Sequence, residues 1–518
     1  MKGRLLAGVL GMLLAASPAA RAQTSSGPRR ITLDDLLAVP RLGRPVLSPN
    51  GSQFAFLRNG QIYLMSLHGS SKDAGPCGAC GWPTLLTTTA GAKSAPAWSP
   101  DGSQIAYVSD ESIWVVSSRG GMPRRLTSGA LGPGDPRLNG DRAPAWSPKG
   151  TWILFTSGRS GQDQLRVVRA DGTGLTSLAP MESYEGMPTV ATGDAVQVDT
   201  FNPGPAWSPS GTMISYTERA PAYFSGKLQV LHFDPASGQA MGAPRTLYTA
   251  APDPGGAWAI SQVAWSPDSK TLAVVLEAQG WDKVFLFSPG GGSPRQLTHG
   301  PSEDLTPVFS PDGQNLALVS NRGALEQERI WIMPLNGDAP HQLTRLSADV
   351  ETAPQWSPDG SKIYFLRSTP IESTDLWVAP VNGAQGTVAA QALTNTTPAD
   401  FAAPGFLPPR RVAFRSKDGL EIEGILFYPA GYQAGRKYAA VLWEHGGPES
   451  ESRFSFSSWP LMLAQQGYLV LEPNYRGSTG FGQKFRNLNV KDSGGGEVDD
   501  NAAAVEYLIH SGLADPHR

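Results

Sequence analysis

The stretch Trp98–Gly102 reads WSPDG, and variants of it return along most of the chain. Successive copies begin about 45 to 60 residues apart, at Leu47, Trp98, Trp146, Trp207, Trp265, Phe309 and Trp356. Repeats of this period indicate propeller blades or solenoid units, in which each repeat is one supersecondary element. The sequence therefore predicts about seven units, with six or eight left open in case a divergent copy is miscounted.

The repeat that contains Trp98 favours a propeller over a helical solenoid. Asp101 and Gly102 are residue types that supply the positive φ angles of a tight hairpin turn. After them come short segments rich in β-branched and aromatic residues, which predict strands at Ile105–Ser109 and Ile113–Val116 and a closing strand from Arg125. No helical periodicity interrupts these segments. Each repeat therefore predicts a four-stranded sheet.

The Trp or Phe before each Ser-Pro is expected to pack between neighbouring blades. Strand edges that stay exposed promote aggregation, and closing the sheets into a ring protects every blade at once. We therefore assign these aromatic residues a structural role and not a ligand-binding one. The interpretation predicts an all-β propeller over residues 31–398.

The pattern changes at about Ala399, where Pro and Gly mark a linker. Beyond it, apolar runs and turn signals predict strands at Arg411–Ser416, Ile422–Tyr428, Ala439–Trp443 and Tyr468–Glu472 and a helix at Phe456–Gln466. A second helix is predicted at Glu497–His510, with one apolar face formed by Val498, Ala502, Val505, Leu508 and Ile509. Strands alternating with helices indicate an α/β domain.

Three motifs in this second part carry a family resemblance. They are HGGP from His445, NYRGSTGFG from Asn474 and GGGEVDDNAAAVEYLIHSGLADPHR from Gly494. Placed after a WSPDG propeller, they resemble the prolyl oligopeptidase family of serine peptidases, in its acylaminoacyl-peptidase and dipeptidyl-aminopeptidase branch. The resemblance covers Ile31 to Arg518. It implies that residues 399–518 are the N-terminal, incomplete part of an α/β-hydrolase catalytic domain and that the propeller admits only short peptides to it.

The resemblance also implies a catalytic machinery. A Ser nucleophile on a G-x-S-x-G elbow is expected, with an acid and a His later in the chain. The backbone at His445, Gly446 and Gly447 is expected to help stabilise the oxyanion. No Ser in the sequence has Gly both two residues before and two residues after it. We therefore expect nucleophile, acid and base beyond Arg518, no catalytic residue within these 518 residues, and no activity from this chain alone.

Several polar residues near the motifs have two interpretations each. His445 is expected to anchor its loop by hydrogen bonding, with general-base use as the alternative. Asp499 and Asp500 are expected to favour the helix start electrostatically, the alternative being an acid pair. Arg476 either binds a substrate carboxylate or braces its loop, and the sequence favours neither.

Glu326 and Glu328, in LEQER, are candidates for binding the amino terminus of a substrate. We expect instead an exposed charge run between strands, because the denser acidic motif of the dipeptidyl peptidase branch is not evident. Exopeptidase specificity stays open. The sequence predicts no metal, nucleotide or other cofactor.

The N-terminal segment has the features of a secretion signal. Lys2 and Arg4 form a basic start, Leu5–Ala16 is an apolar run too short to span a bilayer, and Ala20-Arg21-Ala22 is an A-x-A cleavage site. This pattern predicts a signal peptide over residues 1–22 and a periplasmic or secreted protein. No later stretch is apolar enough to span a membrane.

Only two cysteines, Cys77 and Cys80, are present. A C-x-x-C pair can be a redox motif, half a zinc site or a local disulfide. Zinc would need a second ligand pair, and Gly and Pro surround this one, so a disulfide that closes a surface loop is favoured.

The charge balance limits the partners of the protein. The 42 Lys and Arg residues against 45 Asp and Glu give a formal charge of -3, which argues against nucleic-acid binding.

The main hypothesis is an exported serine peptidase that cleaves short peptides through an acyl-enzyme. The first alternative is a non-catalytic propeller that binds peptides or an envelope partner, as Tol-system propellers do. The second is a split enzyme whose triad lies on another chain.

Overall fold

The computed structural model describes residues 32–39, 42–43, 45–67, 81–128, 140–159, 164–180, 204–219, 226–250, 260–344, 349–381, 390–397, 407–447 and 449–518. The predicted signal peptide and the pair Cys77 and Cys80 lie outside the described residues.

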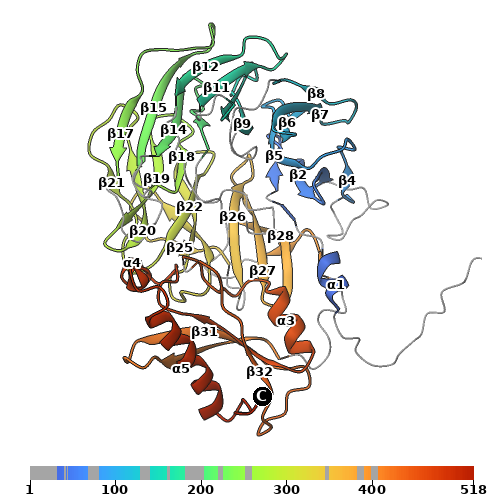
Figure 1. Cartoon of the computed structure of the whole chain (residues 1–518). Coiled ribbons are helices and arrows are strands. Elements are labelled where there is room, and N and C mark those ends of the chain that lie inside the picture. Colours follow the sequence, from blue (N-terminus) through green and yellow to red (C-terminus); the bar gives the residue numbers. More distant parts are fainter. Residues whose placement is uncertain are drawn as a thin grey trace, which may run out of the picture.

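Seven antiparallel sheets follow one another in the described residues before position 400 (Figure 1). The first three are β1–β4 (Val46–Leu47, Gln53–Arg58, Gln61–Ser66, Thr84–Leu85), β5–β8 (Lys93–Trp98, Gln104–Ser109, Ser112–Ser117, Arg124–Arg125) and β9–β12 (Asp141–Trp146, Trp152–Ser157, Gln164–Arg169, Thr176–Pro180). The fourth has five strands, β13–β17 (Ala206–Trp207, Met213–Arg219, Gly226–Asp234, Gln239–Ala240, Arg245–Thr249).

The last three sheets again have four strands each. They are β18–β21 (Gln262–Trp265, Leu272–Ala278, Trp281–Phe287, Arg295–Gln296), β22–β25 (Asp304–Phe309, Asn315–Ser320, Arg329–Pro334, His341–Gln342) and β26–β29 (Val350–Trp356, Lys362–Thr369, Glu372–Pro380, Gln391–Ala392). We number these sheets blades 1 to 7. The predicted count of about seven is confirmed.

The turn in the WSPDG motif differs in detail from the prediction. Gly102 has a φ of 69°, but Asp101 is not in the positive-φ region. Asp101 instead accepts hydrogen bonds from the Ser99 hydroxyl and the Ser103 amide, at 2.5 and 3.0 Å. The tight two-residue hairpin lies one turn later, between β6 and β7, where Asp110 and Glu111 have φ angles of 46° and 56°.

The motif Trp residues pack between blades, as predicted. Trp98 is 8% exposed and belongs to the apolar cluster shared by blades 1 and 2. Its indole N–H donates to the carbonyl of Val46 in the preceding blade, at 2.9 Å. The same contact recurs three more times, from Trp146 to Ala97, from Trp207 to Ala145 and from Trp356 to Val308. The repeat therefore encodes both a turn and a contact with the neighbouring blade.

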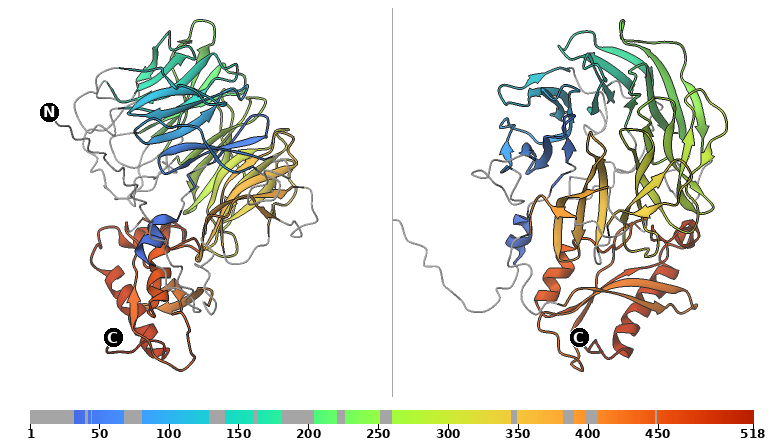
Figure 2. Two further views of the ribbon diagram at one scale, coloured as in Figure 1. Left: turned by 90° about the vertical axis from the view of Figure 1, so that its right-hand side faces the viewer. Right: turned by 180° about the vertical axis from the view of Figure 1, so that it is seen from behind.

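Blades 1 and 7 close the ring (Figure 2). Gln355 in β26 accepts a hydrogen bond from the amide of Leu47 at 3.0 Å and donates one to the carbonyl of Pro45 at 2.6 Å. An apolar cluster joins the two blades, with Phe54, Phe56 and Met65 on one side and Tyr364, Leu366, Leu376 and Leu393 on the other. The predicted closed propeller is confirmed.

Residues 407–518, called here the α/β region, form a mixed sheet with helices. The sheet order is β30 (Arg410–Arg415), β31 (Glu421–Phe427), β33 (Leu469–Asn474) and β32 (Ala440–Leu442), and only the β32–β33 pair is parallel. The helices are α3 (Ser458–Gln465), α4 (Gln483–Arg486), a short 3₁₀ turn at Asn487–Asn489 and α5 (Gly496–His510). The four strands, α3 and α5 lie within a few residues of the predicted elements, whereas α4 and the 3₁₀ turn were not predicted.

The apolar face predicted for the last helix is right at Leu508 and Ile509 and wrong at Val498, Ala502 and Val505. In α5 the buried residues are Asp500, Ala503, Ala504 and Leu508, which pack on the sheet. Val498 and Val505 are 55% and 44% exposed. Hydrophobic periodicity places Val498 and Val505 on the buried face because these side chains are larger than those of Ala503 and Ala504, which pack on the sheet.

The α/β region packs against blades 5, 6 and 7. The backbone N–H of Gln483 donates to the carbonyl of Gly280 at 2.6 Å, and the side-chain amide of Asn321 donates to the carbonyl of Gly480 at 2.9 Å. A short N-terminal helix, α1 (Leu33–Ala38), is followed by Val39, which packs on α3 beside Ile371 of blade 7. Within the described residues, no helix is both long and apolar enough to cross a bilayer.

Candidate functional site

The loop His445–Gly447, called here the oxyanion loop, follows β32 at the carboxyl end of a parallel strand pair. Gly446 and Gly447 are exposed, and the φ of Gly447 is 130°, a conformation that favours glycine. Neither glycine amide donates a hydrogen bond to another described residue. The loop therefore presents two backbone donors to its surroundings, as a site that stabilises an oxyanion requires.

His445 anchors this loop to the turn after β33. Its ring stacks on Tyr475, with centroids 4.5 Å apart and planes 15° apart. The Tyr475 hydroxyl donates to the His445 carbonyl at 2.7 Å, and His445 Nε2 lies 2.9 Å from Ser478 Oγ. These contacts support the predicted anchoring role. Ser478 is fully buried, so this Ser–His contact is not an accessible nucleophile with its base.

Arg476 is engaged by two carboxylates. Its backbone amide and Nε donate to Asp500 Oδ2 at 2.8 and 2.9 Å, and its Nη2 donates to Oδ1 at 2.7 Å. Its Nη1 lies 2.9 Å from Asp418. The side-chain hydrogen bonds that Arg476 donates to Asp500 raise the pKa of Arg476 above its usual value. This geometry supports the loop-bracing interpretation; binding of a substrate carboxylate by Arg476 stays a prediction.

Asp499 and Asp500 diverge. Asp499 lies in the first turn of α5, half-exposed, with its carboxylate 3.7 Å from Lys417 Nζ. Asp500 is completely buried against Arg476. The two carboxylates serve separate cations, which does not support the acid-pair alternative.

The expectation that Glu326 and Glu328 lie on an exposed charge run is wrong. They are 3% and 6% exposed, in the blade 6 loop between β23 and β24, which packs on the α/β region. Arg453 Nη1 lies 2.9 Å from Glu328, and its Nη2 binds Glu451. Burial raises the pKa of both Glu326 and Glu328. The tertiary contact with residues 449–454 buries them, and no local sequence pattern announces it.

Two carboxylate oxygens in this cluster lack a hydrogen-bond donor among the described residues. Glu326 Oε2 is buried without a hydrogen-bond partner among the described residues, and the nearest cation, Arg411 Nε, is 3.6 Å away. Glu451 Oε2 is buried in the same way. Glu451 also faces His445, where its charge opposes the effect of burial on the imidazole. The oxyanion loop and the acidic residues of blade 6 thus share one interface.

Sequence reasoning missed three residues of this site, Arg453, Glu451 and Tyr475, and considered Ser478 only as a near match to G-x-S-x-G. Tyr475 and Ser478 belong to NYRGSTG, so the motif contained them without indicating their contacts. No set of three or more His, Cys, Asp or Glu side chains among the described residues is placed to hold a metal.

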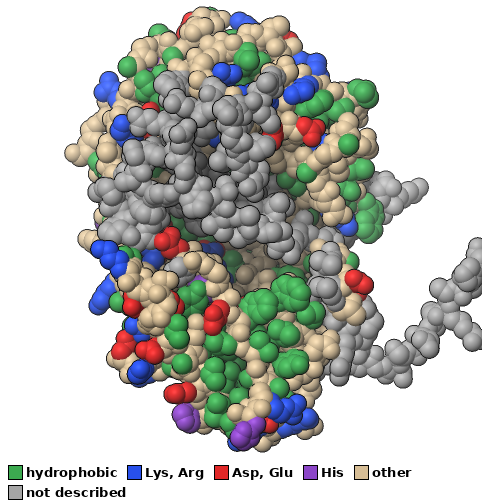
Figure 3. Space-filling model, in the orientation of Figure 1, with side chains coloured by type: hydrophobic (Ala, Val, Ile, Leu, Met, Phe, Trp, Pro, Cys, Tyr) green, Lys and Arg blue, Asp and Glu red, His purple; other side chains and the backbone are tan. Residues whose placement is uncertain are grey.

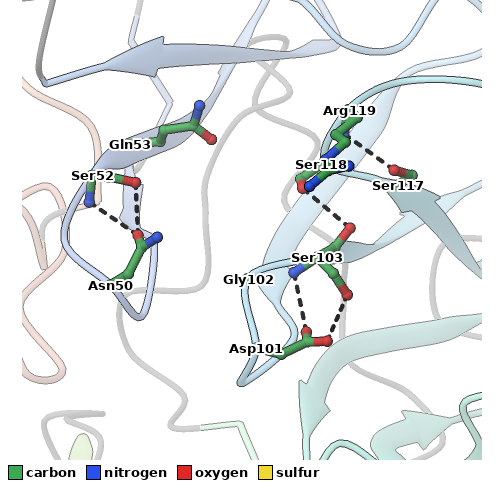
Figure 4. Close-up of a pocket in the computed structure, with 9 residues that line it drawn as sticks. All are labelled: Asn50, Ser52, Gln53, Asp101, Gly102, Ser103, Ser117, Ser118 and Arg119. Atoms are coloured by element: carbon green, nitrogen blue, oxygen red, sulfur yellow. Dashed lines mark hydrogen bonds between the residues drawn. The ribbon is translucent and has the colours of Figure 1, made fainter.

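A cavity of about 630 Å³ lies far from this site, between the motif turns of blades 1 and 2 (Figure 4). The α/β region contacts the opposite strand ends, such as the turn between β19 and β20. Polar side chains in the cavity bond within their own turns: Asp101 to Ser103, and Asn50 to Ser52.

Two family models match the chain. The TolB beta propeller domain matches residues 45–199 and 204–399, and the prolyl oligopeptidase family matches residues 454–518. Dipeptidyl-peptidase 5 of Porphyromonas gingivalis is 26% identical over 318 residues, which cover 50% of this chain and 46% of that protein. A probable dipeptidyl-peptidase 5 of Aspergillus clavatus is 25% identical over 59% of this chain and 34% of its own length. The chain spans about half or less of the length of these curated relatives.

Solved structures share the fold. A puromycin-hydrolyzing peptidase of Mycobacterium tuberculosis matches with a TM-score of 0.75 and 18% identity, over 95% of this chain and 75% of that one. The acylaminoacyl peptidase of Pyrococcus horikoshii matches with a TM-score of 0.63 and 15% identity, over 92% and 72%. At these identities the likeness concerns architecture: a propeller joined to an α/β hydrolase domain.

Proposed function

Because the chain belongs to the prolyl oligopeptidase family, we propose that it is part of an exported serine peptidase that hydrolyses short peptides through an acyl-enzyme. One observation carries the proposal: two backbone donors that no described residue engages, at Gly446 and Gly447, stand on a loop that His445 anchors. Donors aimed at a developing negative charge stabilise the tetrahedral intermediate of acyl transfer. A module that only binds peptides has no need of them.

The nucleophile, acid and base of this proposal come from residues outside these 518. No G-x-S-x-G occurs in the sequence, and Ser478, the near match in RGSTG, is buried beneath the oxyanion loop. The 518 residues by themselves are therefore proposed to form no acyl-enzyme.

The buried acidic cluster supports recognition of a free substrate amino terminus. Glu326 Oε2 and Glu451 Oε2 are desolvated acceptors without donors among the described residues. Leaving such a group unmatched costs about 1–3 kcal/mol, which an ammonium group would recover by donating hydrogen bonds. The dipeptidyl-peptidase names of the curated relatives agree with this chemistry. We therefore propose exopeptidase action on peptides with a free amino terminus.

Export is the remaining part of the proposal. The basic start, the apolar run and the A-x-A site in residues 1–22 support secretion to a periplasm or the medium. A non-catalytic, peptide-binding propeller is the second candidate, favoured by the TolB propeller match over most of the chain.

Labelling with a fluorophosphonate tests the proposal, because the reagent reacts with activated serines. The protein purified from its native cells is expected to react and to release dipeptides from unblocked peptide substrates. The recombinant 518-residue chain is expected not to react. Absence of labelling in the native protein would favour the peptide-binding alternative, and labelling of the recombinant chain would place a nucleophile among these residues.

The amino-terminal preference has its own test in the 518-residue chain. A dipeptide with a free amino group should bind at least tenfold more tightly than its N-acetyl form, as measured by calorimetry. E326Q should abolish this difference. E506Q, on the exposed face of α5, is the matched control and should leave it intact. Equal affinities of the two dipeptides for the unmodified chain would contradict exopeptidase recognition.

A further inference from the structure

The hydrogen bonds of Ser478 fix the proton position on His445. Ser478 Oγ lies 2.6 Å from the carbonyl oxygen of Tyr475, which can only accept. The single hydroxyl proton of Ser478 must therefore point at Tyr475. Ser478 Oγ is then an acceptor toward His445 Nε2 at 2.9 Å, so Nε2 carries a proton.

The other ring nitrogen faces a second acceptor. His445 Nδ1 lies 3.1 Å from the carbonyl oxygen of Gly446. In a neutral ring with its proton on Nε2, Nδ1 presents a lone pair to this carbonyl, and the contact is repulsive. In the imidazolium form, Nδ1 carries a proton and the same contact becomes a hydrogen bond. The contact between the Gly446 carbonyl and His445 is therefore repulsive or attractive according to the charge of the ring.

That carbonyl belongs to the peptide that carries one of the two proposed oxyanion donors. The Gly446 carbonyl and the Gly447 N–H lie in one planar group and point in opposite directions. Turning the carbonyl toward or away from His445 turns the Gly447 N–H with it. Glycine on both sides lets the peptide rotate at low cost.

We propose that His445 is a positioning residue whose protonation state sets the direction of the Gly446–Gly447 peptide and hence of the Gly447 oxyanion donor. The inference rests on the proposed function for its catalytic meaning, because only a hydrolase uses that donor. Tyr475 fixes the plane of the His445 ring by stacking on it, and Ser478 fixes the proton on Nε2 by accepting its hydrogen bond.

The surroundings set the direction of the pH dependence. Burial lowers the pKa of His445 below its usual value of 6.5, while the bond to Gly446 and the charge of Glu451 act in the opposite direction. The neighbouring Tyr475 also interacts with Glu444 and Glu497. The ring is therefore neutral at pH 8, and Nδ1 gains its proton only below pH 6.5.

Nuclear magnetic resonance of the full 518-residue chain tests the proposal. With ¹⁵N-labelled histidine and glycine, the His445 ring should carry its proton on Nε2 at pH 8 and become doubly protonated below pH 6.5. The Gly446 and Gly447 amide signals should shift with the same midpoint. H445N assigns the ring signals among the seven histidines.

Two variants separate positioning from simple packing. S478A removes the acceptor at Nε2, so the neutral ring is expected to move its proton to Nδ1 and bind the Gly446 carbonyl at every pH. The Gly447 amide should then stop titrating. Y475F removes only the hydroxyl that holds the His445 carbonyl and should leave the Nε2 proton in place.

A wild-type ring with its proton on Nδ1 at pH 8, or glycine amides that do not follow the ring, would overturn the proposal. This result is independent of the fluorophosphonate labelling above. A failure of the peptidase assignment would therefore leave the coupling itself standing, and a failure of the coupling would leave the peptidase assignment standing.

Discussion

The propeller and the α/β region solve the burial of apolar surface in different ways. Each blade meets a neighbour on both sides, and at four interfaces the same indole-to-carbonyl contact repeats. In the α/β region, α5 covers the sheet with one stripe and leaves Val498 and Val505 exposed. Figure 3 shows apolar side chains gathered over the α/β region. A repeated motif can encode its own neighbour, whereas a single helix depends on distant residues to choose its buried face.

The largest effect is expected at an interblade tryptophan. W98A removes a buried indole from the cluster shared by blades 1 and 2 and its bond to Val46. Such a truncation costs about 3–5 kcal/mol of unfolding free energy. W82A is the matched control, since Trp82 is 64% exposed, and should change stability by less than about 0.5 kcal/mol. Denaturant titration measures both; similar losses in the two variants would contradict the role of the motif residue.

A second pair of variants separates the buried and exposed faces of α5. L508A opens a cavity against the sheet, because Leu508 is 2% exposed, and should cost about 2–5 kcal/mol. V505A, one turn away on the exposed face, should cost less than about 1 kcal/mol. The difference is read from denaturant midpoints of the two proteins. A larger loss in V505A would mean that the exposed face is covered in solution.

The contrast explains which features the sequence could predict. Trp98 recurs in a fixed motif, so its structural role follows from repetition and from the need to protect blade edges. The strands around Asp418 follow from alternation and turn chemistry, which are local. The buried face of α5 cannot be predicted from such local signals, because Ala503 and Ala504 give a weaker periodic signal than Val498 and Val505.

The site shows the same limit. HGGP identifies the oxyanion loop, but the partners of His445 come from another turn, 30 and 33 residues away. The sequence around Glu326 and Glu328 predicts an exposed charge run because it is rich in charged residues. Burial comes from the segment around Arg453, which only tertiary structure brings to blade 6. Long-range electrostatic pairs leave no periodic trace in a sequence.

Buried acids sharpen the comparison between the two regions. In blade 6, Asp304 is fully buried, and its ion pairs with Arg322 and Lys283 overcome the effect of burial and lower its pKa. In the α/β region, Glu472 on β33 forms no ion pair with a described residue and accepts a hydrogen bond from Ser457 beside α3. Burial raises its pKa to about 7. The fold therefore stabilises Asp304 in its charged form and Glu472 in its neutral form.

These opposite shifts predict opposite pH dependences. A carboxyl with a raised pKa binds its proton more tightly in the folded state, so its contribution is full below about pH 4.5 and is lost as the pH rises to about 7. The shift of Glu472 corresponds to at most about 3 kcal/mol. E472Q keeps an acceptor for Ser457 without the charge, so the variant should match the wild type near pH 4.5 and exceed it in stability at pH 8. E506Q, on the exposed face of α5, should leave stability within about 0.5 kcal/mol of the wild type at both pH values. Thermal unfolding at the two pH values measures the difference, and an E472Q effect that is equal at pH 4.5 and pH 8 would show that folding does not raise the pKa of Glu472.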